Sequence, residues 1–200
     1  MADVVTTTDN TNNMDDYIRT ASGNFVSRHA TLQGAQQVEL KGRTWVDAGV
    51  TLRGDLAPIR VGRYNAIGKN TTIAPPILMP TSSNAENKKY APVSVGAHTS
   101  IGMDCDIQAA AIGSYNSIGN HVVLGPRVIL KDAVVVMEGT KIPADTVIPP
   151  FTLVKMAPPD STTLPPQLVH IPLSPATIPL LQDEALDSYH ERVRLTTASA

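Results

Sequence analysis

Cysteine, aromatic residues and long apolar runs are all scarce in this sequence, and each scarcity removes a class of protein. The single cysteine, Cys105, cannot form an intramolecular disulfide, and one thiol is too few for a cysteine-rich zinc cluster. Two Phe and one Trp in 200 residues leave a core made mainly of Val, Ile and Leu. No apolar run approaches the ~20 residues of a transmembrane helix, and residues 1–16 lack the basic and apolar regions of a secretory signal. We therefore expect a soluble cytoplasmic protein.

Basic residues are missing from the start of the chain. Residues 1–16 carry four Asp and no Lys or Arg, residues 17–155 have a net charge of +5, and residues 156–200 have a net charge of −3. The acidic start also lacks hydrophobic periodicity, which predicts disorder over residues 1–16. A mildly basic body favours either docking to an acidic partner or simple solubility. Its cations do not form the dense basic patch with interleaved aromatics that is typical of nucleic-acid binders.

A six-residue repeat dominates the middle of the chain. Glycine often follows the aliphatic residue of each repeat, and a small or β-branched residue stands four places after it. The aliphatic residues are Val61, Ile67, Ile73, Val95, Ile101, Ile107, Ile112, Ile118, Leu124, Leu130, Val136, Ile142, Ile148 and Val154. An amphipathic helix requires spacings of three and four, and a half-buried strand requires two. A period of six instead predicts short straight segments joined by corners, with the aliphatic residue pointing inward and Gly, Asn or Asp making the turns, including positive φ where it is needed.

Such segments cannot bury an apolar side alone, so successive coils must stack at the strand spacing of ~4.8 Å and share one core. We predict an all-β parallel β-helix over residues 17–155, with about six coils between Val26 and Val154. Repeats of this form resemble the left-handed β-helix superfamily, and that resemblance implies the left hand. The lone Cys105 falls at a small, buried repeat position.

The repeat is interrupted at three places. The stretch RGDLAPIRVG, residues 53–62, lengthens one step to nine residues and predicts a short bulge. Residues 74–92 are rich in proline and lack the core pattern, so we expect a projecting surface loop. A step of only five at Ala109–Ala111 predicts a tightened corner with small side chains.

The tail, residues 156–200, begins with a proline-rich extended stretch that cannot be helical. Residues 180–194 then place Leu181, Ala185, Leu186 and Tyr189 on one stripe, which predicts a short amphipathic helix. A β-helix exposes unpaired strand edges at its ends. The tail is therefore either a cap or strap folded back on the body, or an arm that binds a partner.

Two enzyme classes use this architecture. The segment RGDLAPIRVG resembles γ-class carbonic anhydrases, whose three histidines bind zinc and lower the pKa of the bound water. That resemblance places the three ligand positions at Ala74, Met103 and Gln108, where no histidine stands. Hexapeptide acyltransferases use one histidine as a general base between adjacent subunits. Because a single histidine is easy to find, spacing leaves that alternative open. We interpret the five histidines, His29, His98, His121, His170 and His190, as solvent-exposed structural residues, and of these only His98 and His121 can approach each other. We expect no catalytic residue, no metal and no cofactor.

Four stretches carry a closer resemblance: TASGN followed by SR, LRGDLAPIRVG, QAAAIGSY and TVIPPF, all within residues 16–155. Together they resemble the family of twenty-five-kilodalton pointed-end subunits of dynactin, the dynactin subunit 5 family. The resemblance implies a non-enzymatic subunit that supports dynein-based microtubule transport and recruits cargo such as endosomes. It also implies a location in the cytoplasm, on the cytoskeleton.

The partners implied by this resemblance are a second left-handed β-helix of twenty-seven kilodaltons, an actin-related protein and a larger pointed-end dynactin subunit, with dynein and cargo adaptors reached indirectly. We expect no nucleic acid and no membrane insertion. Lys88, Lys89 and Tyr90 of the projecting loop are the candidate protein interface. Arg53 and Asp55 are expected to form a salt bridge that fixes a coil edge or a subunit contact. Which face meets which partner, and whether the isolated chain is a monomer or a homotrimer, stay open.

Overall fold

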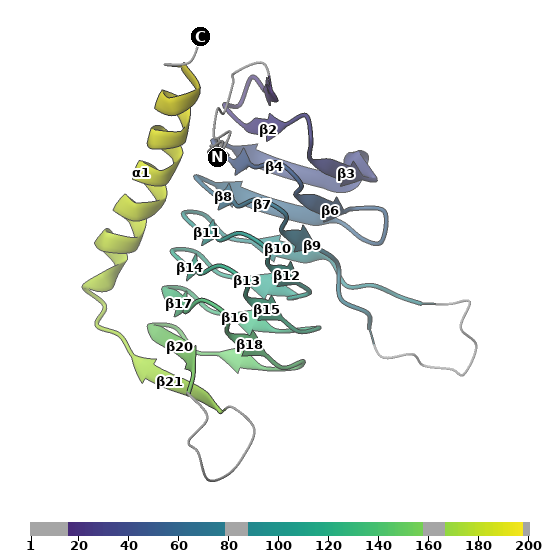
Figure 1. Ribbon diagram of the computed structural model, residues 1–200. Coiled ribbons are helices and arrows are strands. Elements are labelled where there is room, and N and C mark those ends of the chain that lie inside the picture. The colour runs from purple at the N-terminus through teal and green to yellow at the C-terminus, as the bar shows by residue number, and fades with distance from the viewer. Residues whose placement is uncertain (1–15, 79–87, 158–166, 198–200) are drawn as a thin grey trace, which may run out of the picture.

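The computed structural model describes residues 16–78, 88–157 and 167–197, and over them the chain winds into a three-sided parallel β-helix (Figure 1). Three sheets form its sides, here called sheets A, B and C. Each coil contributes one short strand to each sheet in the order A, B, C. Six coils carry all three strands, and a seventh begins in sheet A, as the repeat predicts.

The strands follow one another along the axis within each sheet. Sheet A contains β1 (Tyr17–Arg19), β2 (Phe25–Ser27), β5 (Trp45–Val46), β8 (Ala66–Ile67), β11 (Ser100–Ile101), β14 (Ser117–Ile118), β17 (Val134–Val136), β20 (Thr152–Met156) and β21 (Leu168–Pro172). Sheet B contains β3 (Thr31–Gln33), β6 (Thr51–Arg53), β9 (Thr72–Ile73), β12 (Asp106–Ile107), β15 (Val123–Leu124) and β18 (Lys141–Ile142). Sheet C contains β4 (Val38–Gly42), β7 (Ile59–Arg63), β10 (Val93–Val95), β13 (Ala111–Ile112), β16 (Ile129–Leu130) and β19 (Val147–Ile148).

The core is a column of aliphatic side chains stacked from coil to coil. All fourteen aliphatic residues of the repeat are at most 5% exposed. Register pairs align them directly, as with Ile67, Ile101 and Ile118 in sheet A. The position four places later is also buried in most repeats, including Thr71, Cys105 and Val122. The six-residue pattern therefore predicts which side chains are buried along the whole axis of the β-helix.

The corners depart from the sequence-based prediction in one respect. Positive φ falls mostly on non-glycine residues three places after the aliphatic one, such as Tyr64, Asn70 and His98. The repeat glycines instead allow neighbouring coils to approach. A Cβ on Gly62 would lie 2.5 Å from the carbonyl oxygen of Gly96 in the next coil. The expectation that these glycines provide positive φ is wrong, because the coil spacing, and not the turn, requires them.

Both ends of sheet A are extended by antiparallel strands. β1 pairs with β2 at one end, and β21 pairs with β20 at the other. After β21 the helix α1 (Thr177–Thr197) returns along the outside of the coils toward β2 (Figure 1). The predicted amphipathic helix is confirmed, with longer bounds than residues 180–194. The folded-back strap, and not a free arm, is what the structure shows for the described part of the tail.

The strap buries one stripe of its side chains against the outer surface of sheet A. Leu181, Ala185 and Tyr189 are 4–8% exposed. Tyr189 packs in an aromatic cluster with Phe25 and Trp45, and its hydroxyl donates to the carbonyl oxygen of Gly23 at 2.8 Å. This cluster holds the only Trp and one of the two Phe of the chain. In the described residues, no helix combines the length and apolarity required to cross a membrane.

Candidate functional site: a docking edge along one corner

Every interruption of the repeat emerges at the same corner, the one between sheets B and C. We call it the loop corner. In chain order it carries the 3₁₀ turn η2 (Ala35–Gln37), the 54–57 turn, the 74–92 loop, the tightened step at 109–111, and the turns at Arg127 and Asp145. Figure 1 shows the two described arms of the loop, residues 74–78 and 88–92, leaving the coils between β9 and β10. The other two corners stay short, so this edge alone presents irregular backbone on the described body.

Arg53 and Asp55 form the expected ion pair on this corner. Nε of Arg53 lies 2.8 Å from Oδ1 of Asp55, and Nη2 lies 2.9 Å from Oδ2, so the contact is bidentate. The hydrogen bond from Arg53 holds the pKa of the Asp55 carboxyl below its usual range and raises that of the guanidinium. Both side chains are 36% exposed, so the pair orients the turn while remaining available at the surface.

The base of the 74–92 loop is an ordered antiparallel hairpin. Ile77 and Tyr90 form a β-bridge, the Leu78 amide donates to the Lys89 carbonyl oxygen at 2.8 Å, and the Ala91 amide donates to that of Pro76 at 2.9 Å. Lys88 and Lys89 are exposed and Tyr90 is half-buried. Arg53 ends β6 and Tyr90 comes just before β10, and these strands belong to adjacent coils. The predicted interface residues and the predicted edge pair therefore lie on the same corner in neighbouring coils.

A second ion pair ties the loop base to the body. Arg127 is held bidentately by Asp145 of the next coil, with Nε 2.6 Å from Oδ1, and its Nη1 donates to the carbonyl oxygen of Ile77 at 2.8 Å. This contact runs from the third coil to the fifth. The hydrogen bond from Arg127 lowers the pKa of Asp145, so the pair persists at neutral pH.

The fourth coil lies between the loop base and Arg127. Its short step places Ala109, which is fully buried, at the corner, and Pro75 and Pro76 above it are also buried. The Gln108 carbonyl oxygen accepts from the Arg127 amide at 3.1 Å. The small side chain of Ala109 is thus buried at the tightened corner, where a larger one would have less room.

The ion pair of Arg127 and Asp145 was not predicted from the sequence. They stand eighteen residues apart, which is three repeats and therefore one coil. Opposite charges one coil apart at the same corner position would have predicted this ion pair. The hydrogen bond from Arg127 to Ile77 could not be predicted in this way, because it depends on where the loop folds.

The three positions that the resemblance to carbonic anhydrases marks as zinc-ligand positions, Ala74, Met103 and Gln108, do not meet within this chain. Ala74 and Gln108 follow β9 and β12 in register and stack on the loop corner. Met103 lies on the other side of sheet B, at the corner between sheets A and B, and is 43% exposed. Methyl, amide and thioether groups are poor zinc ligands. In the described residues, no group of three or more His, Cys, Asp or Glu side chains converges.

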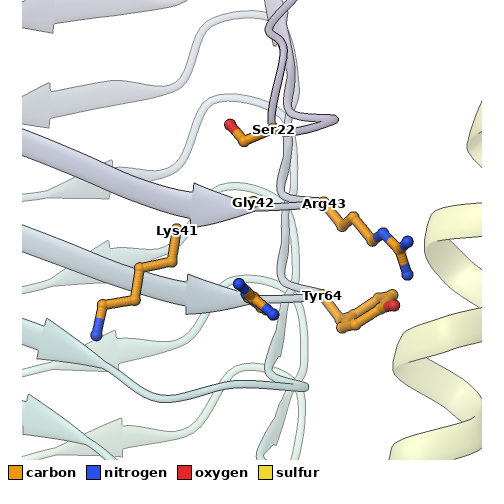
Figure 2. A pocket seen from close by; sticks show the side chains of 6 residues that line it. Ser22, Lys41, Gly42, Arg43 and Tyr64 are labelled. Carbon is orange, nitrogen blue, oxygen red and sulfur yellow. The ribbon is translucent and has the colours of Figure 1, made fainter.

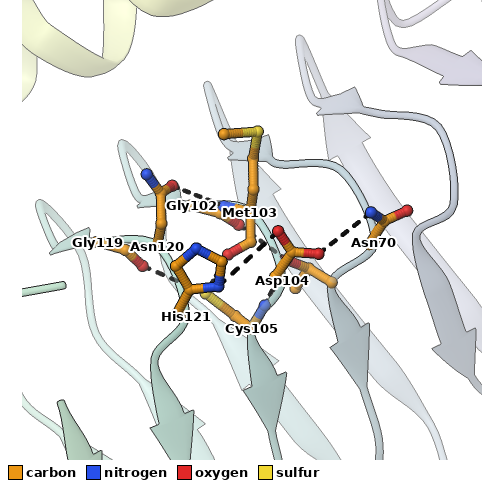
Figure 3. Close-up of polar contacts among 9 residues, drawn as sticks. Asn70, Gly102, Met103, Asp104, Cys105, Gly119, Asn120 and His121 are labelled. Atoms are coloured by element: carbon orange, nitrogen blue, oxygen red, sulfur yellow. Dashed lines mark hydrogen bonds and ion pairs between the residues drawn. The ribbon is translucent and has the colours of Figure 1, made fainter. Parts of the chain in front are cut away.

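The corner that carries Met103 holds a polar column (Figure 3). Asn70 donates to Oδ1 of Asp104 at 3.1 Å, and Nδ1 of His121 lies 3.9 Å from Oδ2 of the same carboxylate. Cys105 is buried beside them and its thiol donates to the Gly119 carbonyl oxygen at 3.2 Å. Burial raises the pKa of that thiol, which favours its protonated and less reactive form.

His98 departs from the prediction of an exposed histidine that can approach His121. It lies on the third corner, between sheets C and A, stacked between Tyr64 at 5.0 Å and Tyr115 at 5.3 Å. Its Nδ1 is buried without a hydrogen-bond partner, and burial lowers its pKa. His98 and His121 therefore occupy different corners, because one full coil plus one further side separates these two places, which look equivalent in the repeat.

Comparison with known proteins agrees with the architecture and identifies a family. A family model described as dynactin subunit 5 matches residues 7–175. Dynactin subunit 5 of Dictyostelium discoideum is 39% identical over 99 residues, which cover 49% of this chain and 48% of the relative, so the match spans about half the length of that relative.

Among solved structures, a hexapeptide transferase family protein from Anaplasma phagocytophilum superposes with a TM-score of 0.59 at 16% identity, covering 87% of this chain and 93% of the other. At that identity the likeness concerns the fold alone. The family model, in contrast, accounts for most of the chain, including every coil and β21. The chain belongs to the dynactin subunit 5 family.

Proposed function

We propose that this chain is a non-catalytic structural and docking subunit of the dynactin pointed-end complex. The observation that carries the proposal is the family match over residues 7–175. In this role the rigid β-helix holds the loop corner in a fixed position for its partners. The subunit thereby supports dynein-based transport along microtubules and the recruitment of cargo such as endosomes, in the cytoplasm and on the cytoskeleton.

The chemistry of the loop corner supports docking. Tyr90 offers an amphipathic ring with a hydroxyl, the residue type enriched at protein interfaces. Lys88 and Lys89 are exposed beside it, and Leu78 is 41% exposed on the facing strand of the hairpin. The hairpin is held by Arg127, so less conformational entropy is lost on binding than with a free loop.

The partners proposed for this edge are the twenty-seven-kilodalton β-helical pointed-end subunit, the actin-related protein and the larger pointed-end subunit, with dynein and cargo adaptors bound indirectly. The resemblance to the left-handed β-helix superfamily also implies that the coils are left-handed. Catalysis is disfavoured by the side chains themselves. Ala74 and Gln108 stand at two positions where the carbonic-anhydrase resemblance expects zinc-binding histidines. His98, the more buried of the corner histidines, is enclosed between two tyrosine rings.

The test is reconstitution of the pointed-end complex with Lys88→Glu/Lys89→Glu/Tyr90→Ala, read by size-exclusion chromatography and pull-down. We expect an unchanged circular dichroism spectrum and at least tenfold weaker assembly. The matched control, Lys69→Glu/Lys141→Glu, changes the net charge by the same amount at other positions on the coils. Normal assembly of the triple variant would remove the loop corner from the proposal. Recovery of the tagged chain as a homotrimer with stoichiometric zinc would overturn the non-catalytic role.

A further inference from the structure

A second polar surface lies away from the loop corner, where β4 and β7 end at the corner between sheets C and A. An open pocket of about 280 Å³ there is lined by Ser22, Lys41, Gly42, Arg43, Arg63 and Tyr64 (Figure 2). We call it the basic pocket. Gly42 and Arg63 are register partners, so the three cations come from two adjacent coils. Because position 42 is glycine, no side chain of β4 stands opposite Arg63.

Positive charge in the basic pocket is not neutralised by the described part of the chain. No acidic residue lines the pocket. Among the described residues, no carboxylate forms an ion pair with Lys41, Arg43 or Arg63. In contrast, Arg127 and Arg192 elsewhere on the body each pair with an aspartate. Three like charges gathered without a counter-charge favour the binding of an anion from outside the described chain.

The three cations are spread along the corner. The Arg43 guanidinium lies over the Tyr64 ring at 5.0 Å, a contact that orients this group while its charge stays unpaired. Lys41 and Arg63 are exposed. In Figure 2 Lys41 and Arg43 extend to opposite sides of Gly42, and not toward one point. This spread suits a ligand with several anionic groups better than a single small anion.

From this arrangement we infer that the basic pocket binds a compact soluble molecule that carries several phosphate groups. Each guanidinium presents paired N–H donors that match two oxygens of one phosphate. The Lys41 ammonium adds a third positive centre with three donors. A small-molecule ligand is a different role from the protein docking proposed for the loop corner, and neither depends on the other.

The helix beside the pocket favours a soluble ligand over a lipid headgroup. Arg43 and Tyr64 point toward α1 (Figure 2), and the Tyr64 ring lies 6.3 Å from that of Tyr189. α1 carries four exposed acidic residues, Asp183, Glu184, Asp187 and Glu191. An anionic membrane pressed against the pocket would also approach these carboxylates, and like charges repel. A small molecule enters the pocket without bringing such a surface near α1.

The experiment is isothermal titration calorimetry of the full chain with inositol hexakisphosphate as the probe. We expect one site per chain and an affinity that falls as the salt concentration rises, because exposed charges are screened. Mellitate, a ring that carries six carboxylates, should bind at least tenfold more weakly, which tests the requirement for phosphate. Inorganic phosphate should also bind at least tenfold more weakly, which tests the requirement for several phosphate groups.

Two double variants locate the site. Arg43→Gln/Arg63→Gln should weaken binding of the hexakisphosphate at least tenfold, with an unchanged circular dichroism spectrum. The matched control, Lys69→Gln/Lys141→Gln, removes two cations outside the pocket and should change the affinity less than twofold. In the unmodified chain the probe should protect Lys41, but not Lys69, from acetylation by an activated ester, as mapped by mass spectrometry. That readout holds even where the pocket variant fails to fold.

Three results would overturn the inference. The first is no binding at millimolar hexakisphosphate, and the second is an equal loss of affinity in both double variants. The third is mellitate or inorganic phosphate binding as tightly as the hexakisphosphate. Vesicles that contain phosphatidylinositol bisphosphate test the source of the phosphate. Pocket-dependent sedimentation with these vesicles, without competition by the soluble probe, would assign the site to a lipid headgroup and overturn the soluble ligand.

Discussion

Arg192 of the strap donates from Nη1 to Oδ2 of Asp47 at 3.0 Å, joining residues 145 positions apart. The other carboxylate oxygen of Asp47 accepts from the Tyr17 hydroxyl at 2.8 Å. One buried aspartate thus connects the first strand, the second coil and the C-terminal helix. Burial, followed by the bond to Asp47, raises the pKa of Tyr17, so its hydroxyl stays a donor throughout the neutral range.

Arg192→Gln should loosen the strap without unfolding the coils. The Asp47 carboxylate is only 9% exposed and would lose its charged partner, so we expect the free energy of unfolding to fall by about 1–3 kcal/mol. Amides of α1 should exchange with deuterium before those of β11 to β17. Asp187→Asn, on an exposed position of the same helix, is the control. Equal exchange in α1 of both variants would argue against the link.

Ile118→Asp should abolish folding. Ile118 is 3% exposed in the middle of the aliphatic column, where a carboxylate would be unpaired between stacked coils. Ile118→Val, which removes one methylene, should cost only about 0.5–1.5 kcal/mol. Circular dichroism and solubility distinguish the two variants. A soluble, β-rich Ile118→Asp protein would contradict the register of the repeat.

Asn65→Ala should cost more stability than Asn116→Ala, although both side chains are at most 2% exposed. Asn65 accepts from the Thr99 amide at 2.7 Å and donates to the Gly96 carbonyl oxygen at 2.8 Å, bridging two coils twice. Asn116 accepts from the Val134 amide, but its Nδ2 has no partner. Asn65→Ala therefore loses one more hydrogen bond than Asn116→Ala. We expect its free energy of unfolding, measured by urea denaturation, to fall by about 1 kcal/mol more. A larger loss at Asn116 would contradict this bonding pattern.

His98 should make the protein less stable in mild acid. Burial between two tyrosines lowers its pKa below 6.5, so the folded state favours the neutral ring. Below that pH the unfolded chain binds the proton more readily than the folded chain, and stability falls as pH drops. His98→Asn, which tolerates the positive φ at this corner, should flatten the decline in urea midpoint between pH 7.5 and 5.5. The exposed His121→Asn serves as the control. Coincident pH slopes for wild type and His98→Asn would exclude His98 as the source.

The repeat made most of the fold predictable. Burial of an aliphatic residue every six positions follows from local sequence. Each corner begins a new straight segment, and each coil repeats the same environment. The interruptions at 53–62, 74–92 and 109–111 were also readable as breaks in the period. The repeat glycines were misread, since the reason for them lies in the neighbouring coil and not in their own turn.

By itself the sequence determined the coil stack, the Arg53–Asp55 pair and the amphipathic tail helix, because each depends on residues close together or on a regular spacing. Tertiary structure alone decided that the interruptions share one corner, that Arg127 holds the loop base, that His98 is enclosed by Tyr64 and Tyr115, and that α1 returns to Asp47. These contacts join residues whose separation follows no period. They depend on how the coils align and where the tail packs, which only the assembled β-helix fixes.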